Sequence, residues 1–336
     1  MNSIERVVDT VNFKKTDRVP VIAQIGGHSA ILSGYRLIDY VKSGVVAAKS
    51  QINALKYYGY DAVFAIFDTC VETEAAGSTI RYREDIYPSV IEYALNESTD
   101  FDNLKVPDPY KDGRMPEILK CVNILRREVG DETVVIGTVI GPMTIATQLV
   151  GIEKALYMAI DFPDRFEKLL EYATKIAISF SIAQLKEGAH TIVVFDPSAS
   201  GTLIPPQFYR EFVLPKHKEL FAELGKNGSA ANWIHSAGKI TDILKYYKEA
   251  GINLVNFDWE MEPDIVKDGL PGICIDGNIK PLDFVNSTPQ NIFDESKRLL
   301  NIFKERGGFI LSSGCEIPPE AKPENIKAMV DAVREP

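Results

Sequence analysis

Short runs of apolar, often β-branched residues recur along this chain and are separated by longer amphipathic segments. Within each run the apolar residues are mostly consecutive instead of alternating with polar ones, which is typical of parallel strands that are covered on both faces. Eight such runs are present, and they span residues 18–26, 61–68, 133–141, 191–200, 229–235, 252–258, 272–278 and 308–315.

The segments between these runs predict helices. In residues 164–188 and 239–251, apolar residues recur every three or four positions and a glycine closes the segment. Eight strand–helix units predict an α/β fold of the (β/α)8 TIM barrel type, preceded by a short N-terminal helical extension. A doubly wound open sheet is the alternative. Because no linker or low-complexity stretch interrupts the pattern, we expect a single domain over residues 1–336.

Composition and charge favour a soluble globular protein over a nucleic-acid-binding or membrane-spanning one. The chain has 336 residues, 45% hydrophobic and 25% charged, which is typical of soluble globular proteins. Its formal net charge of -10 and the lack of a Lys/Arg block argue against a nucleic-acid partner. No apolar run approaches the roughly 18 residues of a membrane span, and the N-terminus has no apolar leader. The four cysteines lack CxxC spacing, which favours reduced thiols, so we expect a cytoplasmic protein.

Polar residues follow most of the predicted strands. Because active sites in (β/α)8 barrels lie at the carboxyl ends of the strands, we expect these side chains to converge on one mouth. The residues concerned are Gln24, His28, Asp68, Glu72, Thr144, Asp196, Asn232, His235, Asn256, Asp258, Asp276, Asn278, Ser312 and Cys315. Capping of the following helix explains any single one equally well, but the ring as a whole favours a polar site.

The chain has four histidines, and His235 is the one best placed for chemistry because it ends a predicted strand. It is a candidate metal ligand, proton carrier or hydrogen-bonding wall of a pocket. His190 opens a predicted strand and His217 lies on a predicted helix, so we expect both to be structural. His28 lies in a glycine-rich loop, where we expect a surface histidine or one that faces a partner.

Several motifs resemble the uroporphyrinogen decarboxylase superfamily. The segment NSIERVVDTVNFKKTDRVPV (2–21) is similar to its opening helix and the turn into the first strand, and GTVIGPMTIATQL (137–149) resembles its Gly-Pro-x-Thr loop. The likeness continues through residues 196–220, 277–284 and 314–333. The resemblance implies a barrel that extends over essentially the whole chain.

The decarboxylases themselves grip a porphyrinogen with many carboxylates, using arginines on the loop after the first strand. Here that loop reads AQIGGHSAILSGYR (23–36) and lacks the motif arginines, so an acidic, arginine-poor mouth disfavours such a substrate. The segments VETEAAG (71–77), FDPSASG (195–201) and SSGCEIPPEA (312–321) resemble the corrinoid-dependent methyltransferases of the same superfamily. These enzymes move a methyl group between the cobalt of a corrinoid protein and a small acceptor.

Thiol-directed members of this branch methylate coenzyme M and hold Zn2+ with a His-x-Cys pair and a distant Cys. The zinc keeps the acceptor thiol as a thiolate. The matching positions here are His235, Ala237 and Cys315. Since Ala237 has no donor atom, we expect a degenerate site without zinc. Recruitment of Asp258 or Glu72 as a third ligand is the alternative.

Without zinc, an amine acceptor that needs no thiolate activation is favoured. The sequence resembles tetrahydrofolate-directed methyltransferases that pair with corrinoid proteins in bacterial demethylation of glycine betaine or methoxylated aromatics. We therefore expect reversible methyl transfer between methylcob(III)alamin, carried by a partner protein at the barrel mouth, and N5 of tetrahydrofolate. His235, or Asp258 in its place, is the expected catalytic residue because it would handle the N5 proton.

A pterin edge is recognised by paired hydrogen bonds to carboxylates and amides. The expected substrate-binding residues are Asp196, Asn232, Asn256, Asp276, Asn278, Glu72 and Cys315. Asp258 is a further candidate for the edge, whereas Cys315 alternatively packs as an apolar filler. Trp233 and Phe257 are expected in the core. Two other functions stay open: zinc-dependent transfer to a coenzyme M-type thiol, and a non-catalytic barrel that binds a corrinoid or a corrinoid protein.

Overall fold

The computed structural model describes residues 1–66, 68–96 and 98–334, and its centre is a parallel sheet of eight strands. The order in the sheet is β1-β10-β9-β8-β7-β6-β5-β2, so the first two strands of the barrel lie at its two ends. The strands are β1 (Val21–Ile22), β2 (Ala62–Phe64), β5 (Val134–Ile140), β6 (Thr191–Phe195), β7 (Asn232–Ser236), β8 (Leu254–Phe257), β9 (Cys274–Ile279) and β10 (Phe309–Ser313). Each lies within one of the predicted runs or overlaps it.

The barrel closes where β1 meets β2. The Asp61 amide donates to the Val21 carbonyl at 2.8 Å, and the Asp61 carboxylate accepts from the Val21 amide at 2.8 Å. The same carboxylate accepts from Arg6 at 2.6 Å and from Arg18 at 2.8 Å. Arg6 belongs to helix α1 (Ser3–Val11), which is the predicted N-terminal extension. The (β/α)8 prediction is therefore confirmed and the open-sheet alternative is wrong.

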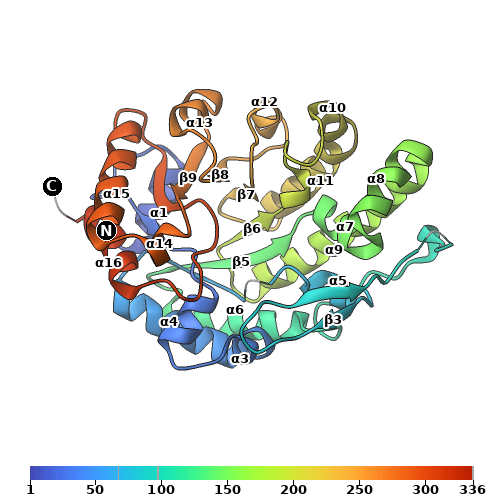
Figure 1. Cartoon of the computed structure of the whole chain (residues 1–336), viewed down its shortest axis with the longest axis horizontal. Coiled ribbons are helices and arrows are strands. Elements are labelled where there is room, and N and C mark those ends of the chain that lie inside the picture. Colours follow the sequence, from blue (N-terminus) through green and yellow to red (C-terminus); the bar gives the residue numbers. More distant parts are fainter. Residues whose placement is uncertain (67, 97, 335–336) are drawn as a thin grey trace.

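Helices surround the sheet and cover its outer face (Figure 1). At least one helix follows each barrel strand. The helices that complete the eight units are α4 (Gly44–Tyr58), α6 (Met115–Val129), α9 (Pro163–Lys186), α11 (Leu214–Lys226), α12 (Leu244–Tyr247), α13 (Pro263–Gly269), α15 (Pro289–Phe303) and α16 (Pro323–Ala332). The prediction over residues 164–188 agrees with α9. Helix α12 is much shorter than the predicted segment 239–251, because turn-like bonds from residue i to i−3, such as Ile243 to Ile240, precede it.

An insertion between β2 and α6 contains an antiparallel hairpin that the sequence pattern does not predict. Its strands are β3 (Thr79–Arg81) and β4 (Ser89–Glu92), and most of their side chains are exposed. Figure 1 shows this insertion at the edge of the molecule, near helices α7 (Pro142–Val150) and α8 (Ile152–Asp161). The Leu95 amide donates to the Leu149 carbonyl at 3.0 Å, which fixes the insertion to α7.

Shorter elements complete the loops around the barrel. They are α2 (Gly27–Leu32), α3 (Leu37–Lys42), α5 (Val71–Ala75), η1 (Phe101–Asn103), η2 (Pro197–Ala199), α10 (Pro206–Phe208), the π-helical turn η3 (Tyr209–Val213) and α14 (Asp283–Asn286). Trp233 and Phe257 are at most 1% exposed, which confirms their core position. In the part of the chain that the structure describes, no helix is both long and apolar enough to cross a membrane.

Candidate active site

Three polar side chains lie next to one another near the mouth of the barrel. His235 on β7, Asn256 on β8 and Asp276 on β9 occupy the same register position in neighbouring parallel strands. Residues paired in this way point to the same face of a sheet. All three are at most 1% exposed, so they form a buried polar layer inside the barrel.

The hydrogen bonds that Asn256 donates determine which ring nitrogen of His235 carries the proton. The Asn256 Nδ2 donates to Asp276 Oδ2 at 2.8 Å, and to the carbonyls of Asp276 and Ser313 at 3.1 and 3.2 Å. Because the amide nitrogen faces these acceptors, its Oδ1 faces His235 Nδ1, which must carry the proton that it donates. His235 Nε2 therefore bears a lone pair, and it has no hydrogen-bond partner among the described residues.

Burial sets the charge of this layer. It lowers the pKa of His235, and the imidazole is therefore neutral at neutral pH. It raises the pKa of Asp276 to about 8, so the carboxyl group is mostly protonated under the same conditions. The His235–Asn256–Asp276 chain is thus uncharged at neutral pH, and His235 Nε2 is its unused basic nitrogen.

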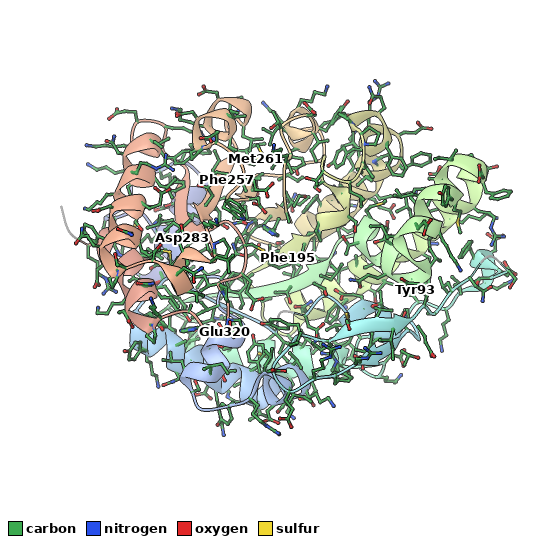
Figure 2. The ribbon with its side chains drawn as sticks, in the orientation of Figure 1. Tyr93, Phe195, Phe257, Met261, Asp283 and Glu320 are labelled. Carbon is green, nitrogen blue, oxygen red and sulfur yellow. The ribbon has the colours of Figure 1, made fainter. Side chains whose placement is uncertain are left out.

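Phe195, at the end of β6, connects His235 with two small cavities. Its ring contacts that of His235 edge-on with centroids 5.2 Å apart, and Figure 2 places it near the centre of the molecule. One cavity, of only about 10 Å3, is lined by Phe195 together with Gln24 and Glu316, among others. The other, which is lined by Phe195 and Glu72 among others, is a packing gap with essentially no free volume. These cavities and the buried layer define the candidate site.

Glu72 and Glu316 bring carboxyl groups to these cavities. Glu72 Oε1 accepts from the Ile140 amide at 2.7 Å, whereas its Oε2 has no partner among the described residues. Burial raises the pKa of Glu72 to about 8 and that of Glu316 to about 7. Glu316 accepts from the Gly27 amide at 3.2 Å and from the Tyr87 hydroxyl. The sequence pattern did not predict a role for Glu316, although it directly follows Cys315 in the segment SSGCEIPPEA (312–321).

Asp196 is fully buried and lies at the start of α7. It accepts from the amide and hydroxyl of Thr144 at 2.8 and 2.6 Å, from the Met143 amide at 3.2 Å and from His217 Nε2 at 2.9 Å. A Cβ on Gly141 would lie 2.4 Å from the Asp196 side chain, which explains the glycine before Pro142. These four donors use the normal capacity of a carboxylate. Substrate binding by Asp196 stays a prediction.

Asp258 and Asn278 hold the loops that follow β7 and β8. Asp258 accepts from the amides of Gly238 and Glu260, both at 2.9 Å. Asn278 Nδ2 donates to the carbonyls of Asp258 and Met261 at 3.1 and 3.0 Å. Both side chains lie at the mouth as expected, but both Asp258 oxygens and Asn278 Nδ2 are bound to the backbone. Their predicted catalytic and substrate-binding roles stay predictions.

Two expected positions are wrong. Asn232 begins β7 instead of ending it, and its Nδ2 donates to the Gly251 carbonyl at 2.8 Å, so it lies away from the mouth. His28 is only 2% exposed and bonds to the Tyr58 hydroxyl at 2.7 Å, so it faces neither solvent nor a partner. The structural role expected for His190 is confirmed, since its Nδ1 accepts from the Val135 amide at 2.9 Å.

A buried arginine near the mouth had no signal in the sequence. Arg114, which precedes α6, donates to Asp68 at 2.6 Å and to Glu74 at 2.6 Å. Asp68 follows β2, whereas Arg114 comes after the whole inserted hairpin, so their separation of 46 residues hides the pair. The ion pairs engage Nη1 and Nε of the guanidinium and fix the start of α6 against the mouth, whereas Nη2 has no partner among the described residues.

The described residues do not fit a three-ligand zinc site. His235 Nε2 has a free lone pair, but Ala237 has no donor atom and both Asp258 oxygens accept backbone amides. Burial raises the pKa of Cys315 to about 11, which favours the thiol over the thiolate that a metal binds. Within the described part of the chain, no group of at least three His, Cys, Asp or Glu side chains is placed to hold a metal ion.

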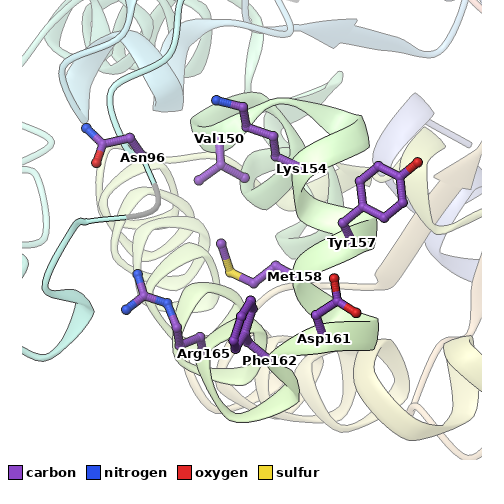
Figure 3. A pocket seen from close by; sticks show the side chains of 8 residues that line it. All are labelled: Asn96, Val150, Lys154, Tyr157, Met158, Asp161, Phe162 and Arg165. Atoms are coloured by element: carbon purple, nitrogen blue, oxygen red, sulfur yellow. The ribbon is translucent and has the colours of Figure 1, made fainter.

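A separate cavity lies outside the barrel, at the rim formed by α8 and the start of α9 (Figure 3). It encloses about 450 Å3, and its lining includes Lys154, Tyr157, Phe162 and Arg165. None of the predicted site residues lines this cavity. This cavity is therefore separate from the candidate site at the mouth.

The barrel and its polar mouth agree with a family match. The model of the uroporphyrinogen decarboxylase (URO-D) family matches residues 2–336. The chain therefore belongs to this family, and the resemblance stated from its motifs is confirmed.

Curated relatives within the family include enzymes of two kinds. Two proteins named methylcobamide:CoM methyltransferase MtbA, from Methanosarcina acetivorans and Methanosarcina mazei, are 28% and 30% identical over 278 residues. Both alignments cover 82% of this chain and 80% of the relative. A uroporphyrinogen decarboxylase from Trichlorobacter lovleyi is 29% identical over an alignment 346 positions long, which covers 98% of this chain and 97% of the relative.

A solved structure shows the same fold. It is described as a methyltransferase from Methanosarcina mazei, and it superposes with a TM-score of 0.91 at 24% identity. The alignment covers 99% of this chain and 98% of that chain. The likeness in fold therefore extends over nearly the whole chain.

Proposed function

We propose that this protein is a corrinoid-dependent methyltransferase whose reaction takes place at the carboxyl end of the barrel. The two relatives named methylcobamide:CoM methyltransferase support the class of reaction. The loop after β1 contains no arginine that could hold a porphyrinogen carboxylate before Arg36, which is exposed and paired with Asp39. These observations favour methyl transfer over decarboxylation.

The observation that carries the chemistry is the buried lone pair on His235 Nε2. In the proposed reaction a thiol R–SH attacks the methyl group of methyl-Co(III), which gives R–S–CH3, Co(I) and a proton. The S–C bond forms while the Co–C bond breaks, and its electron pair stays on cobalt. The proton needs an acceptor, and an unpartnered, neutral imidazole nitrogen is well suited to take it.

The acceptor that the relatives favour is a small thiol such as coenzyme M, because both are named for this substrate. In this chain, proton transfer to His235 would replace the activation of the thiol by a metal. A corrinoid protein would present the methyl group at the mouth.

Tetrahydrofolate is the second candidate acceptor. It is favoured by Ala237, which occupies the position of the second zinc ligand in the thiol-directed enzymes that the sequence resembles. The N5 amine needs no thiolate activation, and His235 would take the N5 proton by the same chemistry.

Anaerobic spectroscopy separates these proposals. The protein is mixed with methylcob(III)alamin and either coenzyme M or tetrahydrofolate, and the conversion of methyl-Co(III) to Co(I) is followed. Conversion with coenzyme M supports the thiol proposal, and conversion with tetrahydrofolate alone supports the second candidate. An unchanged spectrum with both acceptors contradicts catalysis and leaves a corrinoid-binding barrel. Stoichiometric zinc that is lost in His235→Asn would contradict proton transfer without a metal.

A further inference from the structure

A larger cavity lies at the end of the barrel opposite the mouth. It encloses about 730 Å3, and its walls include Val19, which precedes β1, and Phe309, which begins β10. Both residues lie at the amino ends of their strands. Pockets that bind small molecules usually have volumes between about 300 and 1,000 Å3. This cavity has that size, whereas those at the mouth are smaller.

Cationic side chains dominate the charged lining of this cavity. The five lysines and arginines that line it are Lys14, Lys15, Arg18, Lys297 and Lys304, and no aspartate or glutamate is among the lining residues. The chain as a whole carries a formal net charge of -10. A concave surface of one sign in a protein of the opposite sign concentrates ligands of opposite charge.

Two of these cations have no carboxylate partner in the described part of the chain. Arg18 pairs with Asp61 at 2.8 Å, and Lys14 pairs with Asp9 at 3.3 Å. By contrast, Lys15 and Lys304 form no salt bridge with a described residue, and both side chains are exposed. They come from the segment before β1 and from the end of α15, so they reach the cavity from two walls.

The remaining lining residues are suited to contact an uncharged part of a ligand. Val19, Leu300 and Val333 contribute partly exposed apolar surface, and Asn301 contributes an amide. Small-molecule sites commonly combine an apolar lining with a few polar groups that fix the orientation of the ligand. An apolar wall next to two unpaired lysines therefore fits a ligand with an anionic head and a less polar body.

We propose that this cavity binds a phosphate-bearing metabolite of nucleotide size. Its phosphates would contact Lys15 and Lys304, and its ring system would pack against Leu300 and Val333. The site is independent of the methyl-transfer site, because it lies at the other end of the barrel and shares no residue with it.

Calorimetric titration with ATP, adenosine and inorganic tripolyphosphate tests this proposal on the full chain. ATP should bind the unchanged protein more tightly than either adenosine or tripolyphosphate, because only ATP uses both the lysines and the apolar wall. The double variant Lys15→Ala/Lys304→Ala should bind ATP at least about tenfold more weakly, because it loses two charge-assisted contacts to the phosphates.

The matched control is Lys186→Ala/Lys248→Ala, which removes two exposed lysines that do not line the cavity. It should bind ATP within about twofold of the unchanged protein. The proposal is overturned if the unchanged protein does not bind ATP, or if the Lys15/Lys304 variant binds ATP equally well. Equal binding of tripolyphosphate and ATP would overturn the role of the apolar wall.

Discussion

His235 combines burial, a fixed tautomer and one unused lone pair, and these three properties suit a proton acceptor. Asn256 imposes the tautomer because its amide nitrogen is committed to Asp276 and to the Ser313 carbonyl. A histidine with both nitrogens bonded to protein, such as His217 between Tyr209 and Asp196, has no such capacity. His235 and His217 therefore differ in how many of their ring nitrogens are hydrogen-bonded to the protein.

Replacement of His235 by asparagine tests this role. His235→Asn keeps a donor toward Asn256 where Nδ1–H stood and removes Nε2, so we expect the rate of methyl transfer to fall about 100-fold or more. His190→Asn is the matched control, because it keeps an acceptor for the Val135 amide at the other end of the barrel. Stopped-flow absorbance of the cobalt species measures both variants. Equal rates for His235→Asn and the unchanged protein would rule out proton transfer at Nε2.

The raised pKa of Asp276 makes a prediction about stability. Because this pKa is about 8 in the folded protein and about 4 in an unfolded chain, the folded state holds a proton that the unfolded state lacks between these values. This group therefore lowers the free energy of unfolding as the pH rises from about 4 to about 8. Asp276→Asn mimics the protonated form and removes this dependence.

Urea unfolding from pH 5 to pH 8 measures the effect. Relative to the unchanged protein, Asp276→Asn should gain stability with a slope that approaches about 1.4 kcal/mol per pH unit. Asp268→Asn, at an exposed position, should show no such slope. A constant difference between Asp276→Asn and the unchanged protein across this range would show that the carboxyl group is already ionised in the fold.

Part of the site could be predicted from single residues. His235, Asn256 and Asp276 were identified because each stands near the end of an apolar run, and runs that end together in a barrel converge. Asn232 was misplaced because the run 229–235 includes residues that precede the strand, and only its last residues reach the mouth. Arg114 could not be found, because its partner Asp68 is distant in sequence and only the folded chain joins them.

At the scale of elements, Asp196 connects three parts of the fold. From the end of β6 it accepts the first amides of α7 and the side chain of His217 on α11. The amides at the start of a helix have no partner within the helix, so a carboxylate there stabilises it. The Gly-Pro-x-Thr motif supplies the close approach at Gly141 and the hydroxyl of Thr144.

Removal of this carboxylate should destabilise the protein. Asp196→Ala leaves the α7 amides, the Thr144 hydroxyl and His217 without their buried acceptor, so we expect the free energy of unfolding to fall by about 3 kcal/mol. Asp161→Ala, at an exposed position, should change it by less than about 0.5 kcal/mol. Thermal and urea unfolding measure both variants. A loss below about 1 kcal/mol for Asp196→Ala would contradict the anchoring role.

The elements themselves were predictable to different degrees. All eight barrel strands were located, because a strand covered on both faces needs an unbroken apolar run. The hairpin of β3 and β4 was not found, since its mostly exposed side chains leave no apolar run in the sequence. Helix α12 was overestimated because the helical period of residues 239–251 also suits a series of turns.

At the scale of the whole molecule, the closure of the barrel depends on Asp61. Strands β1 and β2 are only two and three residues long, so few backbone bonds join them. Asp61 compensates by accepting from Arg6, Arg18 and the Val21 amide. The N-terminal extension therefore closes the barrel at the end opposite the mouth.

Hydrogen exchange tests this closure. Asp61→Ala leaves Arg6 and Arg18 without their shared buried carboxylate, so the free energy of unfolding should fall by about 3 to 5 kcal/mol. Amide protection should decrease first in α1, β1 and β2, whereas β6 to β9 should keep theirs longer. A uniform loss of protection across all eight strands would show that the junction of β1 and β2 is no weaker than the rest of the barrel.

The central claim is methyl transfer from cobalt to a small thiol at a mouth where His235 takes the proton. The most direct measurement is the anaerobic absorbance spectrum of methylcob(III)alamin mixed with this protein and coenzyme M. Our account predicts that the methyl-Co(III) bands disappear as Co(I) and methylated coenzyme M form, at a rate that falls when the pH drops below the lowered pKa of His235. Persistence of the methyl-Co(III) spectrum, with no methylated thiol formed, would contradict it.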